Sequence, residues 1–329
     1  GVLSMARGWA ERGLVESAFL DWLEDEGRVS FPWSMIDKIT PHPSERVQEE
    51  LGRLGVADMA IARTNTGTLI APFVNAEITE YLVLEDAFPN GRPALEGAGV
   101  YLTDRTTVEK AEKMKVGTCL NPLHTALAVY GCLLGYTSIA AEMGDADLKA
   151  LVEHIAAESL PVVEDPGILS PRAFIDEVLH ERFPNPAIPD TPQRIAADTS
   201  QKLPVRYGGT LRRYARQSEQ ALAGLEFAPL VFAGWCRYLL GVDDRGNAMP
   251  VSPDPMLPQL QAHLKGIEVG RPDSLAGQLR PILSNAALFG VDLYAAGLGE
   301  RTEEMFRDML AGPGAVRATL HRNCVCKQP

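Results

Sequence analysis

Hydrophobic and polar positions follow a strand-like pattern in part of the first third of the chain. Between residues 56 and 86, the short apolar runs MAIART, LIAPFV and EYLVLED stand apart from one another, and the turn-forming sequence NTGT separates the first two. This pattern favours β-strands. Before this region, residues 5–25 show a helical pattern, residues 28–40 are predicted to be extended and residues 46–54 a short helix. After it, Asn90-Gly91 predicts a turn. The first 105 residues are therefore predicted to be mixed α and β.

The rest of the chain is predicted to be helical. Apolar residues recur at helical spacing, and prolines separate the helical segments. The predicted helices cover residues 121–143, 145–157, 171–182, 192–202, 209–241, 254–266, 273–290 and 301–311. We place the boundary between the two parts near residue 108.

Composition and charge narrow the class of protein. A chain of 329 residues is long enough for two domains. Its net charge of −12 argues against a general nucleic-acid-binding protein, although it leaves room for an anionic small ligand at a locally basic site. Five cysteines are too few for a disulfide scaffold, which favours the reducing cytoplasm. The chain starts at Gly1 without an initiator methionine or a signal-type apolar run, so we expect that an earlier portion was removed.

One uncharged stretch is long enough to resemble a membrane span. The 26 residues between Lys115 and Glu142 carry no acidic or basic side chain, and a spanning helix needs about 20 apolar residues. Asparagine, proline, histidine, threonine and serine within the stretch favour a helix buried in a protein core instead. Gly131 and Gly135 are expected to allow close packing of a neighbouring helix.

No metal site is predicted. Cys324 and Cys326 lie two residues apart near the C-terminal end, with only His321 nearby. A structural zinc site usually takes four ligands, so free thiols are the better interpretation.

The start of the uncharged stretch carries candidate chemistry. Asn121 and Pro122 are favoured residues for a helix start, and His124 follows three positions after Asn121 on the same helix face. Lys115 lies six residues before Asn121, which is about 240° away on a continuous helix, so it is expected to approach from a preceding loop. A lysine with a lowered pKa could move a proton while an amide and an imidazole hold the reacting oxygen. Asn121 as an ordinary cap and His124 as a core histidine bonded to a backbone carbonyl remain open alternatives.

A second cluster of polar residues is predicted on a short helix over residues 192–204, which Thr191 caps and which prolines begin and end. Arg194 and Lys202 lie eight residues apart, about 80° around that helix. Together they could bind the carboxylate of an anionic substrate. A solvated basic face paired with Asp198 is the alternative.

No phosphate-binding loop is present in the sequence. A G-x-G-x-x-G motif does not follow any predicted strand, and no G-x-x-x-x-G-K-[ST] motif occurs. The chain by itself therefore offers no recognisable dinucleotide site.

Four segments between residues 31 and 204 nevertheless resemble successive motifs of one family. They read FPWSMIDKITP, YLVLEDAFPNGRP, KVGTCLNPLHTALAVYGCLLGY and NPAIPDTPQRIAADTSQKLP, and the later GWCRYLLGVDDRGNAM fits as well. In this order they resemble the polyol-specific long-chain dehydrogenases, the mannitol dehydrogenase family. The resemblance implies an NAD-dependent, metal-independent oxidoreductase with an α+β fold. Residues 1–108 would be the remnant of a Rossmann-type α/β cofactor domain, and residues 109–329 a large all-α substrate and catalytic domain.

The resemblance also assigns site residues. It implies Lys115, Asn121 and His124 for catalysis, Arg194, Lys202 and Asp37 for substrate binding, and Glu112 for a proton relay. The gap from Lys115 to Asn121 is one residue longer than the family pattern, and the extra residue is expected in the loop before the helix. Lys113 is the alternative base, although it would lengthen the mismatch.

Within the family, the chain most resembles the branch that interconverts D-fructuronate and D-mannonate. Related uronate or polyol dehydrogenases acting on tagaturonate or mannitol remain open, as does a truncated helical module that is inactive on its own. The family's glycine-rich loop would precede residue 1, so the residues that bind the cofactor are unknown, and NADP remains possible. The expected partner is a small sugar acid, with no nucleic acid or membrane, in a cytoplasmic protein that could be a monomer.

Overall fold

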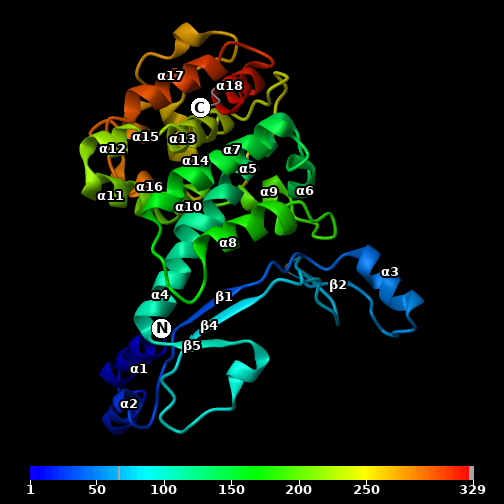
Figure 1. Ribbon diagram of the computed structural model, residues 1–329, viewed down its shortest axis with the longest axis vertical. Helices are drawn as coiled ribbons and strands as arrows, with labels where there is room; N and C mark the ends of the chain where they lie inside the picture. The colour runs from blue at the N-terminus through cyan, green and yellow to red at the C-terminus, as the bar shows by residue number, and fades with distance from the viewer. Residues whose placement is uncertain (66, 326–329) are drawn as a thin grey trace. The chain divides into compact units, whose positions relative to one another are not determined.

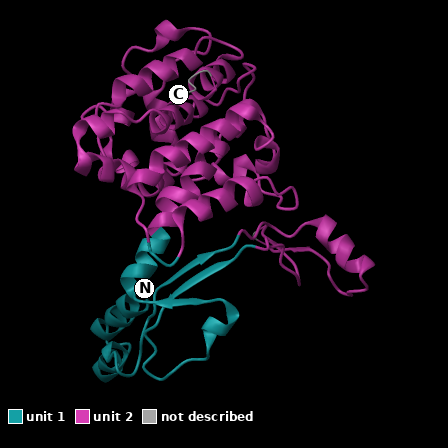
Figure 2. Cartoon of the chain, viewed as in Figure 1, with its two compact units in different colours: residues 1–38, 79–112, 166–168 teal, residues 39–78, 113–165, 169–329 magenta. Residues whose placement is uncertain are grey.

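The computed structural model describes residues 1–65 and 67–325, which divide into two compact units (Figures 1 and 2). Unit 1 comprises residues 1–38, 79–112 and 166–168. Unit 2 comprises residues 39–78, 113–165 and 169–329, apart from the residues that are not described. The chain therefore crosses between the units more than once.

Unit 1 is built on a three-stranded sheet in the order β1-β4-β5 (Figure 1). The bounds of its elements are α1 Val2–Glu11, α2 Ser17–Glu24, β1 Ser34–Asp37, β4 Tyr81–Glu85, the 3-10 helix η1 Leu95–Ala98, β5 Tyr101–Thr103 and the greater part of α4 Arg105–Met114. Strand β4 runs antiparallel to β1, with Val83 opposite Met35, and parallel to β5. Val83 and Met35 are both buried, so the central strand holds the sheet's core.

The helical pattern at residues 5–25 forms two helices, α1 and α2, instead of one. Gly13 follows α1 with a φ of +67°, a left-handed conformation that glycine adopts without a steric penalty. Large apolar side chains on these two helices, among them Trp9 and Trp22, are exposed in the described structure. Such a concentration of exposed apolar groups is typical of an interaction surface.

Residues 39–78 of unit 2 form helix α3 Glu45–Arg53 and a short hairpin of β2 Ala62–Arg63 and β3 Leu69–Ile70. In the hairpin, Ala62 pairs with Ile70 in antiparallel register, within the two runs that were predicted to be strand-like. Thr66, inside the predicted NTGT turn, lies outside the described residues.

The uncharged stretch forms the central helix of unit 2. Helix α5 Asn121–Leu134 is buried from Pro122 to Leu133 and packs against α7, α9 and α13. The hydroxyl of Tyr130 donates a 2.7 Å hydrogen bond to the Leu230 carbonyl of α13. No helix among the described residues is long and apolar enough to cross a membrane. The prediction of a buried core helix is therefore confirmed.

The two glycines of the central helix have different roles. A Cβ atom at Gly131 would lie 2.1 Å from Oε1 of Glu142, so this position needs glycine for close packing. Gly135 instead ends α5 in a left-handed conformation with φ +82°, and no atom lies near a Cβ added there. The expectation of close packing thus holds for the first glycine alone.

The remaining elements of unit 2 are short helices. Their bounds are π-helix η2 Lys115–Cys119, α6 Ile139–Glu142, α7 Ala146–Ser159, η3 Leu160–Val162, α8 Pro171–Glu177, π-helix η4 Val178–Arg182, α9 Pro192–Ile195, α10 Thr199–Arg206, α11 Gly208–Gln217, α12 Glu219–Ala223, α13 Phe227–Tyr238, α14 Leu257–His263, η5 Pro272–Ser274, α15 Arg280–Leu283, α16 Ala286–Phe289, α17 Gly299–Met309 and α18 Ala315–Cys324. Helix α18 was not among the predicted segments, and the long pattern over residues 209–241 is divided among three helices. The predicted α+β class, with a large helical part, is confirmed.

Candidate active site

Lys115 lies at the start of a helical turn of unusual pitch. It begins η2, in which the Leu120 amide donates to the Lys115 carbonyl at 3.1 Å, five residues earlier. Such a π-turn takes up one more residue than an α-helical turn and is frequent at functional sites. The expected loop between Lys115 and Asn121 is therefore wrong, because the extra residue is accommodated in a helix.

Contacts from distant parts of unit 2 support this π-turn. Gly117, Thr118 and Cys119 are buried in it. The Thr210 hydroxyl donates to the Gly117 carbonyl at 3.0 Å. This bond satisfies a carbonyl for which the altered helix pitch provides no regular helical partner. The Sγ atom of Cys119 lies 3.7 Å from the carbonyl oxygen of Pro171.

Asn121 is the first residue of α5, so its predicted position as the cap is displaced by one residue. Leu120 occupies the cap position, and no side chain caps the helix. The backbone carbonyl of Asn121 accepts a 3.0 Å hydrogen bond from the Thr125 hydroxyl. The Asn121 side-chain amide has no hydrogen-bond partner among the described residues, so it is available to a ligand at the helix start.

His124 lies in the first turn of α5 and is buried. Its Nε2 atom is 3.2 Å from Oδ2 of Asp190, and its ring lies 4.9 Å from the ring of Phe183. The contact with Asp190 is an electrostatic one, since it is not aligned as a hydrogen bond. Burial lowers the pKa of His124 despite the nearby carboxylate. The ring is therefore neutral at pH 7, and Asp190 favours a proton on Nε2.

Asp190 also holds Arg194. Its Oδ1 atom accepts from Nε of Arg194 at 2.7 Å and lies 2.6 Å from the NH2 nitrogen. Burial would raise the pKa of Asp190, but the contacts with His124 and Arg194 outweigh burial and lower it. This carboxylate thus connects one predicted catalytic residue with one predicted substrate-binding residue.

The predicted helix over residues 192–204 is broken in the middle. Thr191 caps α9 as predicted, accepting from the Arg194 amide at 3.3 Å. The chain then leaves the helix, Asp198 takes a φ of +53°, and α10 begins at Thr199. Pro204 lies inside α10 and does not end it. The predicted separation of about 80° between Arg194 and Lys202 on one helix is therefore wrong.

Lys202 faces the end of α9. Its Nζ atom donates to the carbonyls of Ile195, at 2.9 Å, and Ala197, at 2.5 Å. Burial and the neighbouring Arg206 lower the pKa of Lys202. An amine at the carboxyl end of a helix is favourable because it satisfies carbonyls that lack an intrahelical partner.

Arg206 is a site residue that the sequence analysis did not identify. It lies four positions after Lys202 on α10, and it donates to the Thr125 hydroxyl at 2.6 Å and the Asn121 carbonyl at 3.5 Å. Asp190 was also missed. Arg206 follows Lys202 by one helical turn, which is a signal available from the sequence, whereas nothing in the sequence pairs Asp190 with His124.

The remaining predicted residues have other surroundings. Asp37 ends β1 in unit 1, opposite Tyr81, and is buried. Glu112 is exposed on α4. The Nζ atom of Lys113, the alternative base, is 3.7 Å from a carboxylate oxygen of Glu164, and its side chain is 46% exposed.

Cysteine chemistry does not add a metal centre. Cys119, Cys132, Cys236 and Cys324 are buried free thiols. Over residues 1–65 and 67–325, no group of three or more potential ligands could hold a metal ion. Cys326 lies outside the described residues.

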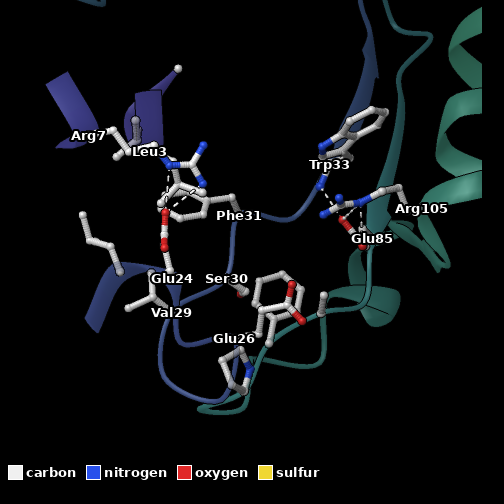
Figure 3. A pocket seen from close by; sticks show the side chains of 16 residues that line it. Leu3, Arg7, Glu24, Glu26, Val29, Ser30, Phe31, Trp33, Glu85 and Arg105 are labelled. Atoms are coloured by element: carbon white, nitrogen blue, oxygen red, sulfur yellow. Dashed lines mark hydrogen bonds and ion pairs between the residues drawn. The ribbon is translucent and has the colours of Figure 1, made fainter. Parts of the chain in front are cut away.

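A cavity of about 910 Å³ lies in unit 1 (Figure 3). Two of the arginines that line it are paired with acids: Arg7 lies 2.7 Å from Glu24, and Arg105 lies 3.0 Å from Glu85. Arg105 also lies over the ring of Trp33, 5.0 Å from its centroid. This cavity therefore differs in character from the cluster around His124, where Arg206 has no ion pair with a described residue.

Similarity to known proteins identifies the family. The sequence model of the mannitol dehydrogenase C-terminal domain family matches residues 107–302. The chain belongs to the mannitol dehydrogenase family.

Within the family, the relatives include two D-mannonate oxidoreductases. The protein from Thermotoga maritima is 56% identical over 97% of this chain and 59% of its own length. The protein from Escherichia coli K12 is 33% identical over 83% of this chain and 50% of its own length. A solved ternary complex of Pseudomonas fluorescens mannitol 2-dehydrogenase with NAD and D-mannitol is 30% identical with a TM-score of 0.73, covering 97% of this chain and 58% of that one. The chain thus spans between half and three fifths of these relatives.

Proposed function

We propose that this chain is the substrate-binding part of an NAD-dependent oxidoreductase that interconverts D-fructuronate and D-mannonate. The observation that carries the proposal is the 56% identity with a D-mannonate oxidoreductase over 97% of the chain. The activity is proposed for a protein of that relative's length. In it, residues 1–108 would belong to an α/β cofactor domain and residues 109–329 to a helical substrate domain. The buried free thiols fit a cytoplasmic enzyme.

Lys115 is the proposed acid and base. As the ketone of D-fructuronate is reduced, the Lys115 ammonium gives its proton to the carbonyl oxygen, and the secondary hydroxyl of D-mannonate forms. In the reverse direction, the neutral amine takes that proton from the hydroxyl. The position of Lys115 at the start of the π-turn before α5 supports this role.

Asn121 and His124 are proposed to hold the reacting oxygen. The side-chain amide of Asn121 donates to the oxygen as negative charge develops on it. His124, whose neutral ring Asp190 restrains, is proposed to orient the reacting oxygen in the site, while Lys115 alone exchanges the hydroxyl proton. The start of α5 adds a positive partial charge that favours the same oxygen.

Arg194 and Lys202 are proposed to line the substrate site, and Glu112 to pass the proton between Lys115 and water. Asp37 keeps the substrate-binding role that the family resemblance implies, as a prediction. The two cations favour an anionic sugar acid over a neutral polyol. Exposure of Glu112 on α4 is what a group exchanging protons with solvent requires.

NAD, when bound, carries the hydride, and its pyrophosphate needs free backbone amides at a helix start. The strand-to-helix turn from β5 to α4 does not fit this group. Its central residue is Asp104, whose carboxylate accepts from the amide and the hydroxyl of Thr107. A carboxylate at that position repels phosphate and already uses a donor that phosphate would need. Other residues of a longer protein would have to form the cradle.

Substrate comparison tests the proposal. The complete gene product is assayed for NADH oxidation with D-fructuronate, D-tagaturonate and D-fructose. We expect the highest kcat/KM with D-fructuronate. A clear preference for D-fructose would overturn the substrate assignment, and no turnover with any of the three would favour a binding module without activity of its own.

A further inference from the structure

Arg206 is a mostly buried cation without an ion pair to any acid that the structure describes. Burial lowers the pKa of its guanidinium to about 10, so it stays charged at neutral pH. Within residues 1–65 and 67–325, no carboxylate lies within ion-pair distance of it. Taking a charge out of water without a partner is costly, and an arriving anion would relieve that cost.

The other two cations of the cluster are already engaged. Arg194 forms two contacts with Oδ1 of Asp190, which offsets its charge. Lys202 donates to two backbone carbonyls at the end of α9. An incoming carboxylate would meet only the donors that these contacts leave over on Arg194 and Lys202, whereas Arg206 offers it a whole guanidinium edge.

Only one nitrogen of Arg206 is used by the protein. Its NH1 group donates to the Thr125 hydroxyl and to the Asn121 carbonyl. The Nε and NH2 groups make no hydrogen bond to any residue that the structure describes. Neither is among the fully buried polar atoms that lack a partner, so both can be reached by solvent or a ligand. These two groups form one edge of the guanidinium, the geometry that binds a carboxylate through two parallel hydrogen bonds.

The position of Arg206 ties this edge to the proposed reaction centre. Asn121 and Thr125 are one turn apart on α5, and Lys202 and Arg206 are one turn apart on α10, so the two helix faces meet at the Arg206–Thr125 contact. Arg206 is close enough to His124 and Lys202 to disfavour their charged forms.

We propose that Arg206 is the specificity-determining residue that binds the carboxylate of the sugar acid, an inference that rests on the proposed function. Arg206 binds the end of the substrate that distinguishes D-fructuronate from D-fructose, which has a neutral hydroxymethyl group in that place. The residue takes no part in the proton step. Arg206 therefore contributes to the recognition of uronates without being required for reduction of the ketone.

The test uses Arg206→Gln in the complete gene product, with Arg216→Gln, an exposed arginine on α11, as the matched control. A lost charged hydrogen bond predicts a KM for D-fructuronate that rises by about 10- to 100-fold, and a much smaller rise of KM for D-fructose, which lacks the carboxylate. Titration of D-mannonate by calorimetry should show the same fold loss of affinity. Arg206→Lys, which keeps the charge but loses the fork, should lie between the wild type and Arg206→Gln.

The outcomes separate this inference from the proposed function. If the wild type reduces D-fructuronate but Arg206→Gln leaves its KM and D-mannonate affinity unchanged, the carboxylate role of Arg206 is wrong and the proposed function stands. Equal loss with D-fructose and D-fructuronate would also overturn it, because a structural role affects both. If Arg206→Gln does not fold, Arg206→Lys decides through its D-mannonate affinity. A wild type without activity or D-mannonate binding refutes both proposals.

Discussion

The Nε2 atom of His124 lies 3.2 Å from Oδ2 of Asp190, and both side chains are buried. This pairing makes Asp190 a positioning residue, since it favours one tautomer of the imidazole and restrains the ring. The same carboxylate holds Arg194, so one acid orders two parts of the proposed site.

Replacing the acid by its amide tests that role. In Asp190→Asn, we expect kcat to fall by about 10- to 100-fold, because the ring loses its preferred orientation while Lys115 is unchanged. Loss of the negative charge should also lower the pKa of His124 further, which a pH profile would record. Asp198→Asn, at an exposed position of the same segment, is the control. A normal kcat and pH profile in Asp190→Asn would contradict the positioning role.

Opposite outcomes are expected for Lys113, in the last turn of α4, and Lys115, the first residue of η2. Lys115→Ala should lower kcat by about 100- to 10,000-fold, the usual contribution of a general acid or base. Lys113→Ala should stay within about 2-fold of the wild type, because it removes an exposed side chain whose ion pair contributes little. Steady-state assays with D-fructuronate compare them. The reverse result would assign the proton step to Lys113.

The central helix could be predicted because its signal is local. The absence of charged residues predicts that the helix is buried, and Asn121-Pro122 and Gly135 mark where it begins and ends. The π-turn before it could not, since the Gly117 carbonyl is satisfied by Thr210, 93 residues away in sequence. The break before α10 also depends on a residue distant in sequence. The carboxylate of Asp254 accepts from the Ser200 amide at 2.7 Å and so caps the start of α10.

The candidate site, too, could be predicted only in part from the sequence. The motif pattern identified the candidate residues around Asn121, but which of their charges are paired depends on contacts between helices. From the sequence, Arg194 and Lys202 could bind an anionic substrate or pair with Asp198, whereas in the structure Asp190 and backbone carbonyls hold them. Among the described residues, the fold brings Arg206 against Thr125 and not against a carboxylate.

Glu142 predicts a distinct pH dependence of stability. The carboxyl is fully buried without a hydrogen-bond partner among the described residues, and burial, with help from Asp145 and Asp190, raises its pKa to about 9. Between pH 4.5 and 9, the folded protein holds a proton that the unfolded chain releases, so the free energy of unfolding falls as pH rises.

Glu142→Gln removes this dependence. We expect it to match the wild type near pH 5 and to be more stable at pH 8, as judged by the urea midpoint. Glu153→Gln, on the exposed face of α7, should change neither value. A wild type whose stability does not fall relative to Glu142→Gln between these pH values would show that the carboxyl ionises in the folded protein at low cost.

A buried ion pair predicts the largest loss of stability. Both Glu77 oxygens accept from the guanidinium of Arg182, at 2.9 and 2.7 Å, and the two side chains are 3% and 1% exposed. The Ile39 amide also donates to Glu77, at 2.5 Å, so this carboxylate joins residues 39–78 to the helices of unit 2. Removing one partner of a buried ion pair typically costs about 3–5 kcal/mol.

We therefore expect Glu77→Gln to lower the free energy of unfolding by about 3–5 kcal/mol in urea titrations. Glu80→Gln is the matched control, because its ion pair with Lys38 involves a side chain that is 71% exposed and should contribute at most about 1 kcal/mol. Since Arg182 precedes Phe183, whose ring contacts His124, Glu77→Gln should also reduce kcat under conditions where the protein is folded. Equal stability of the two variants would mean that water reaches Arg182 and replaces the lost carboxylate.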